Sequence, residues 1–329
     1  MEELYLGWIE QMERGLKKWG EVGVREKPRI VVITGMGGSG CVGDYVYTLA
    51  RMKDNSVPVI VSKDYKLPAF VSEKDLVFVI SYSGNTLETI SAYKQALARN
   101  TNIVIITSDG YLAKEAESRG IPLVKVIEGI APRTALPEML YGVLGVLDVS
   151  GVSIVGKEEA TNALEFIKEN MKYAMEEAYK IAVEINEKKK DLVIATHTPL
   201  EVLAIRGKNE FNENAKIPVK TDVSPEWAHN DIVGWEEPYR RDWFALLVVD
   251  PEDKAGMKLI EFMKTIYSEA GIETYTVELK GRTLLEKLLY GSLLLGLASV
   301  KLARLRGLDP LETRNIKRYK SIVKEIIGS

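Results

Sequence analysis

The sequence is poor in the residues that form disulfides and hold structural metals. Among its 329 residues there is one cysteine, Cys41, and there are two histidines, His197 and His229. A single cysteine excludes an intrachain disulfide and fits a reducing compartment, so we expect a cytoplasmic protein. Two histidines and one cysteine also lack the spacing of a zinc site, and we expect no metal. Cys41 is either a reactive thiol or, as we expect, a small packing residue.

The sequence also lacks a dominant charge and a long apolar run. Its net charge is −3 with no basic block, which gives no support for nucleic acid as a partner. The stretch 284–303 comes nearest to the roughly 18 apolar residues of a membrane span, but Glu286, Lys287 and Lys301 interrupt it. The N-terminal segment is amphipathic and has no apolar region of a signal peptide. We therefore expect no membrane partner.

What the sequence does contain is a regular alternation of apolar strand patterns and helical patterns. Such alternation predicts an α/β fold in which parallel sheets are covered on both faces. A charged helical stretch at 157–189 separates two series, so we place a boundary near Gly151. We expect one lobe at 1–150, with an N-terminal helix, and a second at 151–329, with a C-terminal helix. The predicted strands lie near 29–34, 57–61, 76–81, 102–107, 122–126, 191–196, 217–221, 243–249 and 273–278.

A loop rich in hydroxyl groups follows one predicted strand. The apolar run 76–80 leads into Ser-Tyr-Ser-Gly-Asn-Thr at 81–86, after which a helical pattern begins. A strand that ends in this way at a helix start offers free backbone N–H groups and the positive end of a helix dipole. No lysine or arginine lies between Ser81 and Tyr93, so an anion would be held mainly by dipoles. Taken alone, the loop is equally consistent with an ordinary helix cap.

A glycine-rich loop follows an earlier strand. Gly-Met-Gly-Gly-Ser-Gly at 35–40 satisfies the G-x-G-x-x-G pattern of dinucleotide sites, but Asp64 is only an equivocal match to the acidic residue that should follow. Two small-residue loops one strand apart favour a single small phosphorylated ligand instead. We expect the phosphate and the adjoining sugar edge to bind at Gly38, Ser39, Ser81, Ser83 and Thr86.

These two loops resemble those of the sugar isomerase domain, which binds phosphosugars. The stretches Asn-Glu-Phe-Asn-Glu-Asn-Ala-Lys at 209–216 and Pro-Glu-Trp-Ala-His-Asn-Asp at 225–231 are similar to those of the archaeal-type bifunctional phosphoglucose/phosphomannose isomerases. The resemblance extends from about residue 28 to the end of the chain. It implies two sugar-isomerase-type lobes, each a parallel sheet flanked by helices. It also implies interconversion of glucose 6-phosphate, and of mannose 6-phosphate, with fructose 6-phosphate through an enediolate, without a cofactor.

The resemblance also assigns chemical roles. Glu213, in the E-N-A-K motif, would be the base that moves a proton between C1 and C2. From the residues alone, Glu213 could instead cap or pair on a helix, and Glu210 is the alternative base. His229 would open the sugar ring from the neighbouring subunit, whereas His197 ends a strand and is expected to be structural. Arg133 would stabilise the enediolate; the alternative is a solvated surface arginine.

The C-terminal segment carries two further candidates. Lys320 follows Asp309 at the spacing of the family, and Thr313 lies seven residues before Lys320, on the same helical face. Lys317 is a nearby competitor, and the basic residues here could also form only a solvated face.

The resemblance implies a homodimer, because the family's histidine crosses between subunits. Four aromatic residues lie in the stretch around His229: Trp227, Trp235, Tyr239 and Trp243. Aromatic residues suit an interface or, equally, a core.

Two other functions remain open. One is a non-catalytic phosphosugar-binding regulator, which would not need Glu213, His229 and Arg133 together. The other is an isomerase that forms glucosamine 6-phosphate, which would normally need a glutaminase domain with an N-terminal cysteine.

Overall fold

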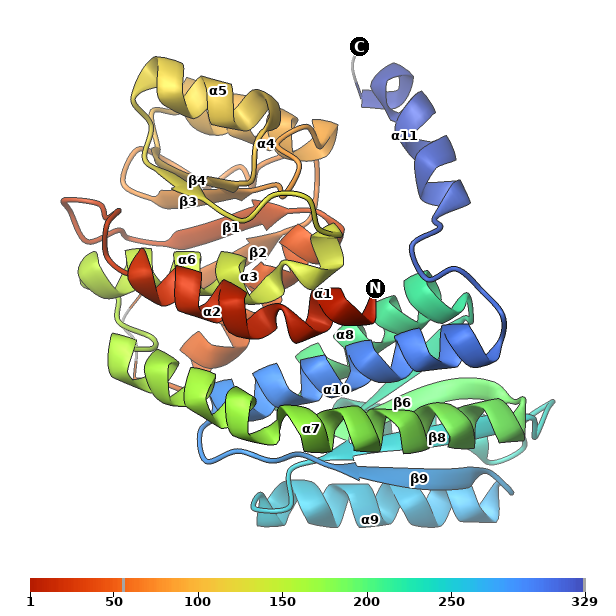
Figure 1. Ribbon diagram of the computed structural model, residues 1–329. Coiled ribbons are helices and arrows are strands. Elements are labelled where there is room, and N and C mark those ends of the chain that lie inside the picture. The colour runs from red at the N-terminus through yellow and green to blue at the C-terminus, as the bar shows by residue number, and fades with distance from the viewer. Residues whose placement is uncertain (55–56, 328–329) are drawn as a thin grey trace. The chain divides into compact units, whose positions relative to one another are not determined.

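The computed structural model describes residues 1–54 and 57–327 and divides the chain into two compact units (Figure 1). The first unit consists of Leu6–Glu165 with Thr313–Ser329, and the second of Met1–Tyr5 with Phe166–Glu312. The division falls inside the long helix α7 (Lys157–Lys188), whereas the boundary predicted near Gly151 lies in the loop before it. Each unit also takes in one end of the chain.

The first unit is built on a five-stranded parallel sheet. Its order is β2 (Val59–Ser62), β1 (Val31–Gly35), β3 (Leu76–Ile80), β4 (Asn102–Thr107) and β5 (Leu123–Lys125). The strands β1 and β3 are buried at every residue, as expected where helices cover both faces of a parallel sheet. All five strands begin and end within about two residues of the predicted ranges.

Helices cover both faces of this sheet. On one face α4 (Leu87–Ala98) and α5 (Gly110–Arg119) enclose an apolar core with β1, β3 and β4. On the other face lie α3 (Gly37–Arg51) and α6 (Leu136–Val149), and α2 (Trp8–Lys17) packs on α6. The C-terminal helix α11 (Arg314–Ile327) contacts α4.

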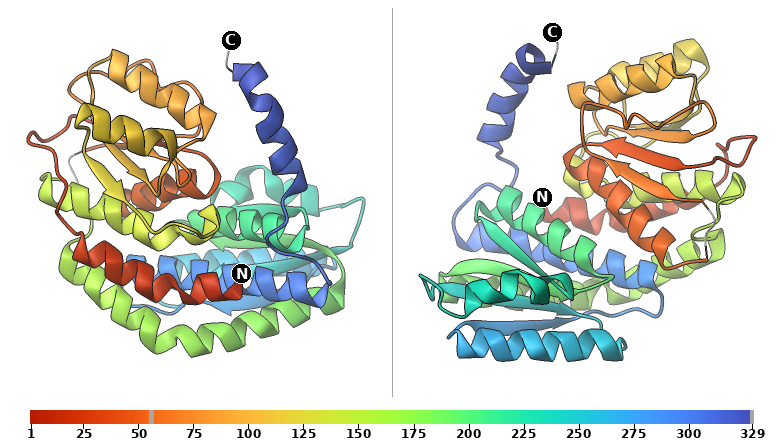
Figure 2. Two further views of the ribbon diagram at one scale, coloured as in Figure 1. Left: turned by 45° about the horizontal axis from the view of Figure 1, so that its top comes forward. Right: turned by 180° about the vertical axis from the view of Figure 1, so that it is seen from behind.

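The second unit is built on a four-stranded parallel sheet. Its order is β7 (Val219–Ser224), β6 (Asp191–His197), β8 (Trp243–Val249) and β9 (Glu273–Glu278). Figure 2 shows this sheet and that of the first unit from two further sides. These four strands also match the predicted ones, so the α/β class and the two parallel sheets are confirmed.

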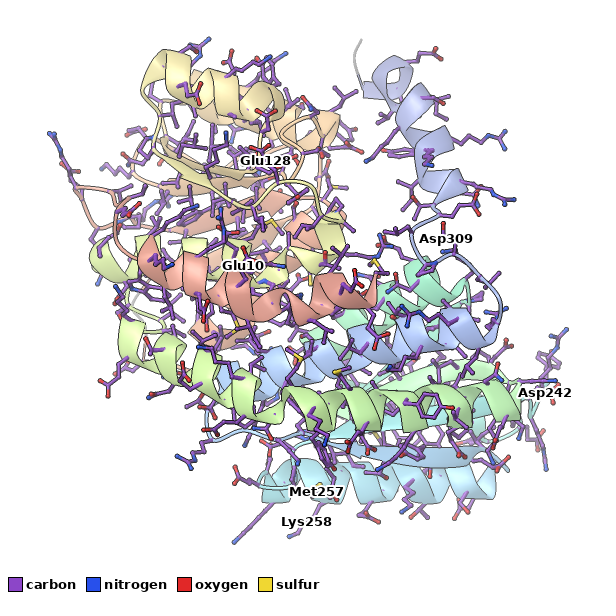
Figure 3. All side chains as sticks on the ribbon, viewed as in Figure 1. Glu10, Glu128, Asp242, Met257, Lys258 and Asp309 are labelled. Atoms are coloured by element: carbon purple, nitrogen blue, oxygen red, sulfur yellow. The ribbon has the colours of Figure 1, made fainter. Side chains whose placement is uncertain are left out.

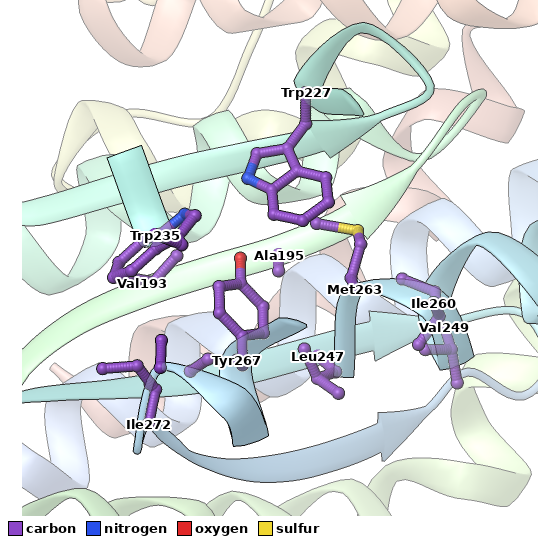
Figure 4. Packing of buried hydrophobic residues seen from close by; sticks show 12 residues of the cluster. Val193, Ala195, Trp227, Trp235, Leu247, Val249, Ile260, Met263, Tyr267 and Ile272 are labelled. Atoms are coloured by element: carbon purple, nitrogen blue, oxygen red, sulfur yellow. The ribbon is translucent and has the colours of Figure 1, made fainter. Parts of the chain in front are cut away.

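Alternate residues of these strands face different helices. Val193, Ala195 and Leu247 pack with Met263 and Tyr267 of α9 (Lys254–Glu269), as Figure 4 shows. On the other face lie α8 (Glu201–Glu210) and α10 (Leu284–Leu305). The short N-terminal helix α1 (Glu2–Leu6) supplies Tyr5 to this unit.

Helix α10 is the one helix in the described part of the chain that is long and apolar enough to cross a membrane. However, 83% of its apolar window is buried inside the protein. Its N-terminus carries a capping box between Thr283 and Glu286, and Lys287 pairs with Asp250 and Glu252. We therefore interpret α10 as a core helix.

Candidate active site

The two small-residue loops lie side by side at one edge of the first sheet. β1 pairs with both β2 and β3, and the chain leaves β1 toward β2 but leaves β3 toward β4. The connections therefore diverge from the carboxyl ends of two neighbouring strands, which is where parallel sheets bind ligands. The prediction that both loops share this edge is confirmed.

Hydrogen bonds connect the loops to each other. The backbone N–H of Tyr82 donates to Oγ of Ser39 at 2.9 Å, and Ser39 is buried. Within the second loop, Oγ of the buried Ser81 donates to Oγ1 of Thr86 at 3.0 Å. The Ser39 and Ser81 hydroxyls therefore already have protein partners and hold the loops in shape.

The second loop presents its remaining donors at the start of α4. Thr86 is the N-cap residue and makes no side-chain capping bond, and Ser83 is exposed. The loop turns at Gly84, whose φ is +66° and where a Cβ would lie 1.8 Å from the carbonyl oxygen of Asp109. Only glycine fits there, and the turn leaves the first N–H groups of α4 to face an anion.

Arg133 lies against the glycine loop. It belongs to the 3-10 turn η1 (Pro132–Thr134) and is 7% exposed, so the alternative of a solvated surface arginine is wrong. A Cβ on Gly38 would lie 2.9 Å from Cα of Arg133 and 2.9 Å from the carbonyl oxygen of Pro132. The close approach of the two backbones thus requires glycine at position 38. It places the backbone of Arg133 directly against the glycine loop.

Tyr82 is a residue of this site that the sequence analysis missed. Its hydroxyl accepts a hydrogen bond from the N–H of Ile130 at 2.9 Å, and its carbonyl accepts one from Oγ of Ser108 at 2.6 Å. Together with its bond to Ser39, these contacts tie three other loops of the first unit to this residue. The signal that could have identified it is the one aromatic side chain among the small residues at 81–86.

The C-terminal helix is attached to the helix that follows the phosphate loop. The hydroxyl of Tyr319 donates to Oε1 of Glu88, in the first turn of α4, at 2.6 Å. Val323 of α11 is buried as well. Thr313 is half-buried just before the helix, and Lys320 is exposed on it. The helix thus belongs to the unit that carries the two loops, while the roles of Thr313 and Lys320 stay predictions.

Glu213 lies in the second unit on a short π-helix, η2 (Phe211–Ala215), which continues α8. Short π-helical turns are rare and occur often at functional sites. Glu213 is half-buried, and the ammonium group of Lys216 donates to its carbonyl oxygen and, at 3.1 Å, to that of Asp309. Figure 3 labels Asp309, from which the chain continues toward α11.

Glu210, the alternative base, is in a different environment. It is 1% exposed and forms an ion pair with the equally buried Arg206, one helical turn earlier. Tyr5 and Asn214 donate hydrogen bonds to its other carboxylate oxygen. A carboxylate so enclosed has no access to a substrate, which argues against Glu210 as the base, while the role of Glu213 stays a prediction.

His229 ends the 3-10 turn η3 (Glu226–His229), beyond the carboxyl end of β7. The segment is held by buried Asp222, which accepts hydrogen bonds from Trp235 at 3.1 Å and Tyr267 at 2.7 Å. Trp227 and Trp235 are therefore core residues (Figure 4), and the interpretation of them as interface residues is wrong.

The other two aromatic residues of this stretch differ in burial. Trp243 is half-buried against the same core, and Tyr239 is fully exposed. A cavity of about 470 Å³ opens beside this segment, and both residues line it.

Glu213 and His229 of one chain lie at opposite ends of the same strand. Glu213 precedes the first residue of β7, Val219, and His229 follows the last, Ser224. β7 is six residues long, so its first and last Cα atoms lie about 17 Å apart. The whole of β7 thus lies between the predicted base and the predicted ring-opening histidine along the chain.

The remaining sequence candidates have structural environments. His197 is fully buried, its Nδ1 lies 2.9 Å from the carbonyl oxygen of Thr198, and the N–H of Asp250 points to its Nε2 at 3.4 Å. Cys41 is buried in α3. Both agree with the expected packing roles. Within the residues that the structure describes, no group of three or more metal-binding side chains was found.

Comparisons with known proteins agree with this arrangement. The model of the sugar isomerase (SIS) domain matches residues 24–126, and that of the bacterial phospho-glucose isomerase C-terminal SIS domain matches residues 174–323. Among solved structures, the C-terminal domain of glucosamine-fructose-6-phosphate aminotransferase from Francisella tularensis superimposes with a TM-score of 0.72 at 16% identity, covering 93% of this chain and 96% of that one. At that identity the likeness shows the fold alone.

Two relatives show the family. The chain is 35% identical over 332 residues to a bifunctional phosphoglucose/phosphomannose isomerase of Aquifex aeolicus, covering 99% of each protein. It is 32% identical over 354 residues to one of Aeropyrum pernix, covering 100% of this chain and 99% of that protein. The chain belongs to the family of bifunctional phosphoglucose/phosphomannose isomerases.

Proposed function

We propose that this protein interconverts glucose 6-phosphate and mannose 6-phosphate with fructose 6-phosphate, without a cofactor, in the cytoplasm. The observation that carries the proposal is the first unit's site. Two hydroxyl-lined loops share one sheet edge and pack against a buried arginine, Arg133. Such a site suits a small ligand that carries a phosphate at one end and develops negative charge near it.

The phosphate binds at the start of α4. Ser83 and Thr86 are the side-chain donors there, since the Ser39 and Ser81 hydroxyls already serve the loops. The positive end of the α4 dipole adds attraction for a dianion. Arg133 carries the charge that the enediolate oxygens need, and a guanidinium can hold them with two donors at once.

Glu213 acts as the base. It takes the proton from C2 of the open-chain aldose; the electron pair of that C–H bond forms the C1–C2 double bond, and the π pair of the C1–O1 carbonyl moves onto O1 to give the enediolate. The protonated Glu213 then returns the proton to C1 while a proton passes from O2 to O1, which yields the ketose. Glucose and mannose differ only at C2, and C2 is planar in the enediolate. One base that reaches both faces of this carbon therefore serves both sugars.

His229 opens the ring in the site of a second copy of the chain. Support comes from the resemblance to the family, whose histidine crosses between subunits, and from β7, which lies between Glu213 and His229 in the chain. The active form is then a homodimer in which each chain donates its histidine. The exposed Tyr239 and Val233 near His229 are side chains that a second copy can cover.

A coupled assay tests the reaction. Fructose 6-phosphate is the substrate, and the formation of glucose 6-phosphate and mannose 6-phosphate is scored separately. Glutamine and ammonia with fructose 6-phosphate test for glucosamine 6-phosphate. Both hexose phosphates are expected and glucosamine 6-phosphate is not. Absence of all turnover, with binding of the phosphosugar retained, would instead support the regulator.

A complementation assay tests the donated histidine. Glu213→Gln and His229→Ala chains are each expected to be inactive, and removal of a general base typically costs about 10²–10⁴ in rate. After subunit exchange, a heterodimer would contain one intact site and one with both defects, so activity should return. Demonstrated heterodimers without recovery, or a fully active monomer in sedimentation, would contradict the homodimer with a shared site.

A further inference from the structure

A fully buried polar network adjoins the proposed base in the second unit. Asn214, the residue after Glu213, is 0% exposed. Its amide nitrogen lies 2.9 Å from Oε2 of Glu210, 2.8 Å from Oγ of Ser299 and 3.3 Å from the hydroxyl of Tyr5. The hydroxyl of Tyr5 donates in turn to Oε2 of Glu210. Three elements distant in sequence, α1, α8 and α10, thus converge on one side chain of the π-helical turn η2.

The network is a charged one. Glu210 forms an ion pair with Arg206, and both side chains are almost fully buried. Burial and the Glu210 carboxylate raise the pKa of Tyr5 well above its usual value, so its hydroxyl stays protonated and donates. Hydrogen bonds to a charged acceptor are shorter and stronger than neutral ones. The hydrogen bond from Tyr5 to Glu210 is therefore suited to holding the turn η2 in place.

The N-terminal helix is itself anchored to α10. Glu2 pairs with Lys301 at 2.8 Å and with Arg304. Burial raises the pKa of Glu2, but the two cations outweigh it and hold the pKa below its ordinary range. The ring of Tyr5 lies directly against Gly296, where a Cβ would come within 2.3 Å of it. These contacts restrain the position of Tyr5 relative to α10.

Fixing Asn214 fixes the direction of Glu213. Adjacent residues on a helix point to different sides, so an amide held inward turns the preceding carboxylate outward. At the other end of the turn, the side chains of Lys216 and Arg306 hold the carbonyl oxygens of Glu213 and Ala215. A wide π-helical turn, which would otherwise relax, is restrained from both sides.

We infer that Tyr5, with Glu210 and Asn214, is a positioning residue for the base, so that the N-terminal helix takes part in catalysis. This inference rests on the role proposed for Glu213. The hydroxyl of Tyr5 touches no substrate; it acts through Asn214, by keeping the Glu213 carboxylate within reach of C1 and C2. Small displacements of a catalytic group slow a reaction strongly, with roughly 10²-fold loss for 1 Å.

Tyr5→Phe tests the inference, because it removes one oxygen and keeps the ring. Its matched control is Tyr290→Phe, on α10 in the same unit, since Tyr290 is buried and its hydroxyl has no hydrogen-bond partner within the described residues. For each variant kcat, KM for glucose 6-phosphate, the isotope effect on kcat with C2-deuterated substrate, and the fraction folded are measured. Tyr5→Phe should lower kcat roughly tenfold, leave KM within about twofold and raise the isotope effect. Tyr290→Phe should match the parent.

A purely structural role for Tyr5 would give a different pattern. Folded Tyr5→Phe protein would then show the kcat and isotope effect of the parent, and this result would overturn the inference. If Tyr5→Phe does not fold, Ser299→Ala decides by the same measurements, because it removes another partner of the Asn214 amide. Glu213→Gln keeps the two claims apart: an active Glu213→Gln protein refutes the base itself. An inactive Glu213→Gln protein beside a parental Tyr5→Phe protein refutes only the positioning role.

Discussion

Gly38→Ala should damage both stability and catalysis, because the glycine loop packs on the turn that carries Arg133. The added Cβ would lie 2.9 Å from Cα of Arg133, 2.9 Å from the oxygen of Pro132 and 3.0 Å from the nitrogen of Arg133. All three are backbone atoms, so none can swing aside. Ordinary contacts begin near 3.4 Å, and the turn or the start of α3 must therefore move by about 0.5 Å.

The size of the effect follows from that displacement. Overpacking of this kind costs about 1–3 kcal/mol, and each kcal/mol lowers the Tm of a large domain by about 2–4 °C. A displacement of about 1 Å of a catalytic group costs about 10²-fold in rate. A displacement of half that size should therefore lower kcat/KM roughly tenfold. Thermal unfolding and the isomerase assay, run on the same preparation, measure the two effects.

Gly156→Ala is the control for destabilisation away from the site. A Cβ there meets no atom within 4 Å, and as the residue before α7 it costs at most about 1 kcal/mol as a poorer N-cap. Its activity per folded molecule should equal that of the parent. Should Gly38→Ala retain kcat/KM within about twofold and the parental Tm, the close packing of loop and turn would not position Arg133, and the reasoning would fail.

Four further outcomes are expected. The double variant Ser83→Ala, Thr86→Ala should raise KM more than it lowers kcat, since it removes binding shared by ground and transition states; steady-state kinetics decide. Exhaustive EDTA treatment should leave activity intact, and restoration by a divalent ion would contradict this. Burial raises the pKa of Asp75, but Arg29 and neighbouring hydrogen-bond donors outweigh it and hold the pKa below its usual value. The stabilisation from the charged Asp75 is present above the unfolded pKa of about 3.9, and it is lost as pH falls through the lower pKa of the folded protein. In urea unfolding, the free energy of unfolding of Asp75→Asn should therefore fall less on acidification than that of the parent. Asp222→Asn should lower the free energy of unfolding by about 1–3 kcal/mol, because it weakens the hydrogen bonds from Trp235 and Tyr267. Urea unfolding measures this loss as well.

The strands were predictable because buried parallel strands are continuous apolar runs. Val31–Gly35 and Leu76–Ile80 have helices on both faces, so every residue is apolar or small, and glycine or serine marks the end. The same patterns predicted the two loops and their common edge. Only chain topology was needed for that step, since neighbouring parallel strands end at the same side.

Contacts between distant segments were not predictable. The close packing of Gly38 on the backbone of Arg133 cannot be read from the sequence, since the loop and the turn meet only after the intervening strands have formed. Likewise the C-terminal helix joins the first unit through Tyr319 and Glu88, whereas sequence order placed it with the second. Burial of one side chain against another depends on the tertiary fold and not on local periodicity.

The choice between Glu210 and Glu213 shows where the limit lies. The two are three residues apart, so on a regular helix they would share a face and could exchange roles. One signal was present: Arg206 stands four residues before Glu210, the spacing of a helical ion pair. That spacing alone describes a weak surface pair. In this protein the pair is buried, and loss of one charge would leave the other uncompensated, at a cost of about 3–5 kcal/mol in the free energy of unfolding. A carboxylate under that constraint is committed to structure, which argues against Glu210 as the base and leaves the role of Glu213 a prediction.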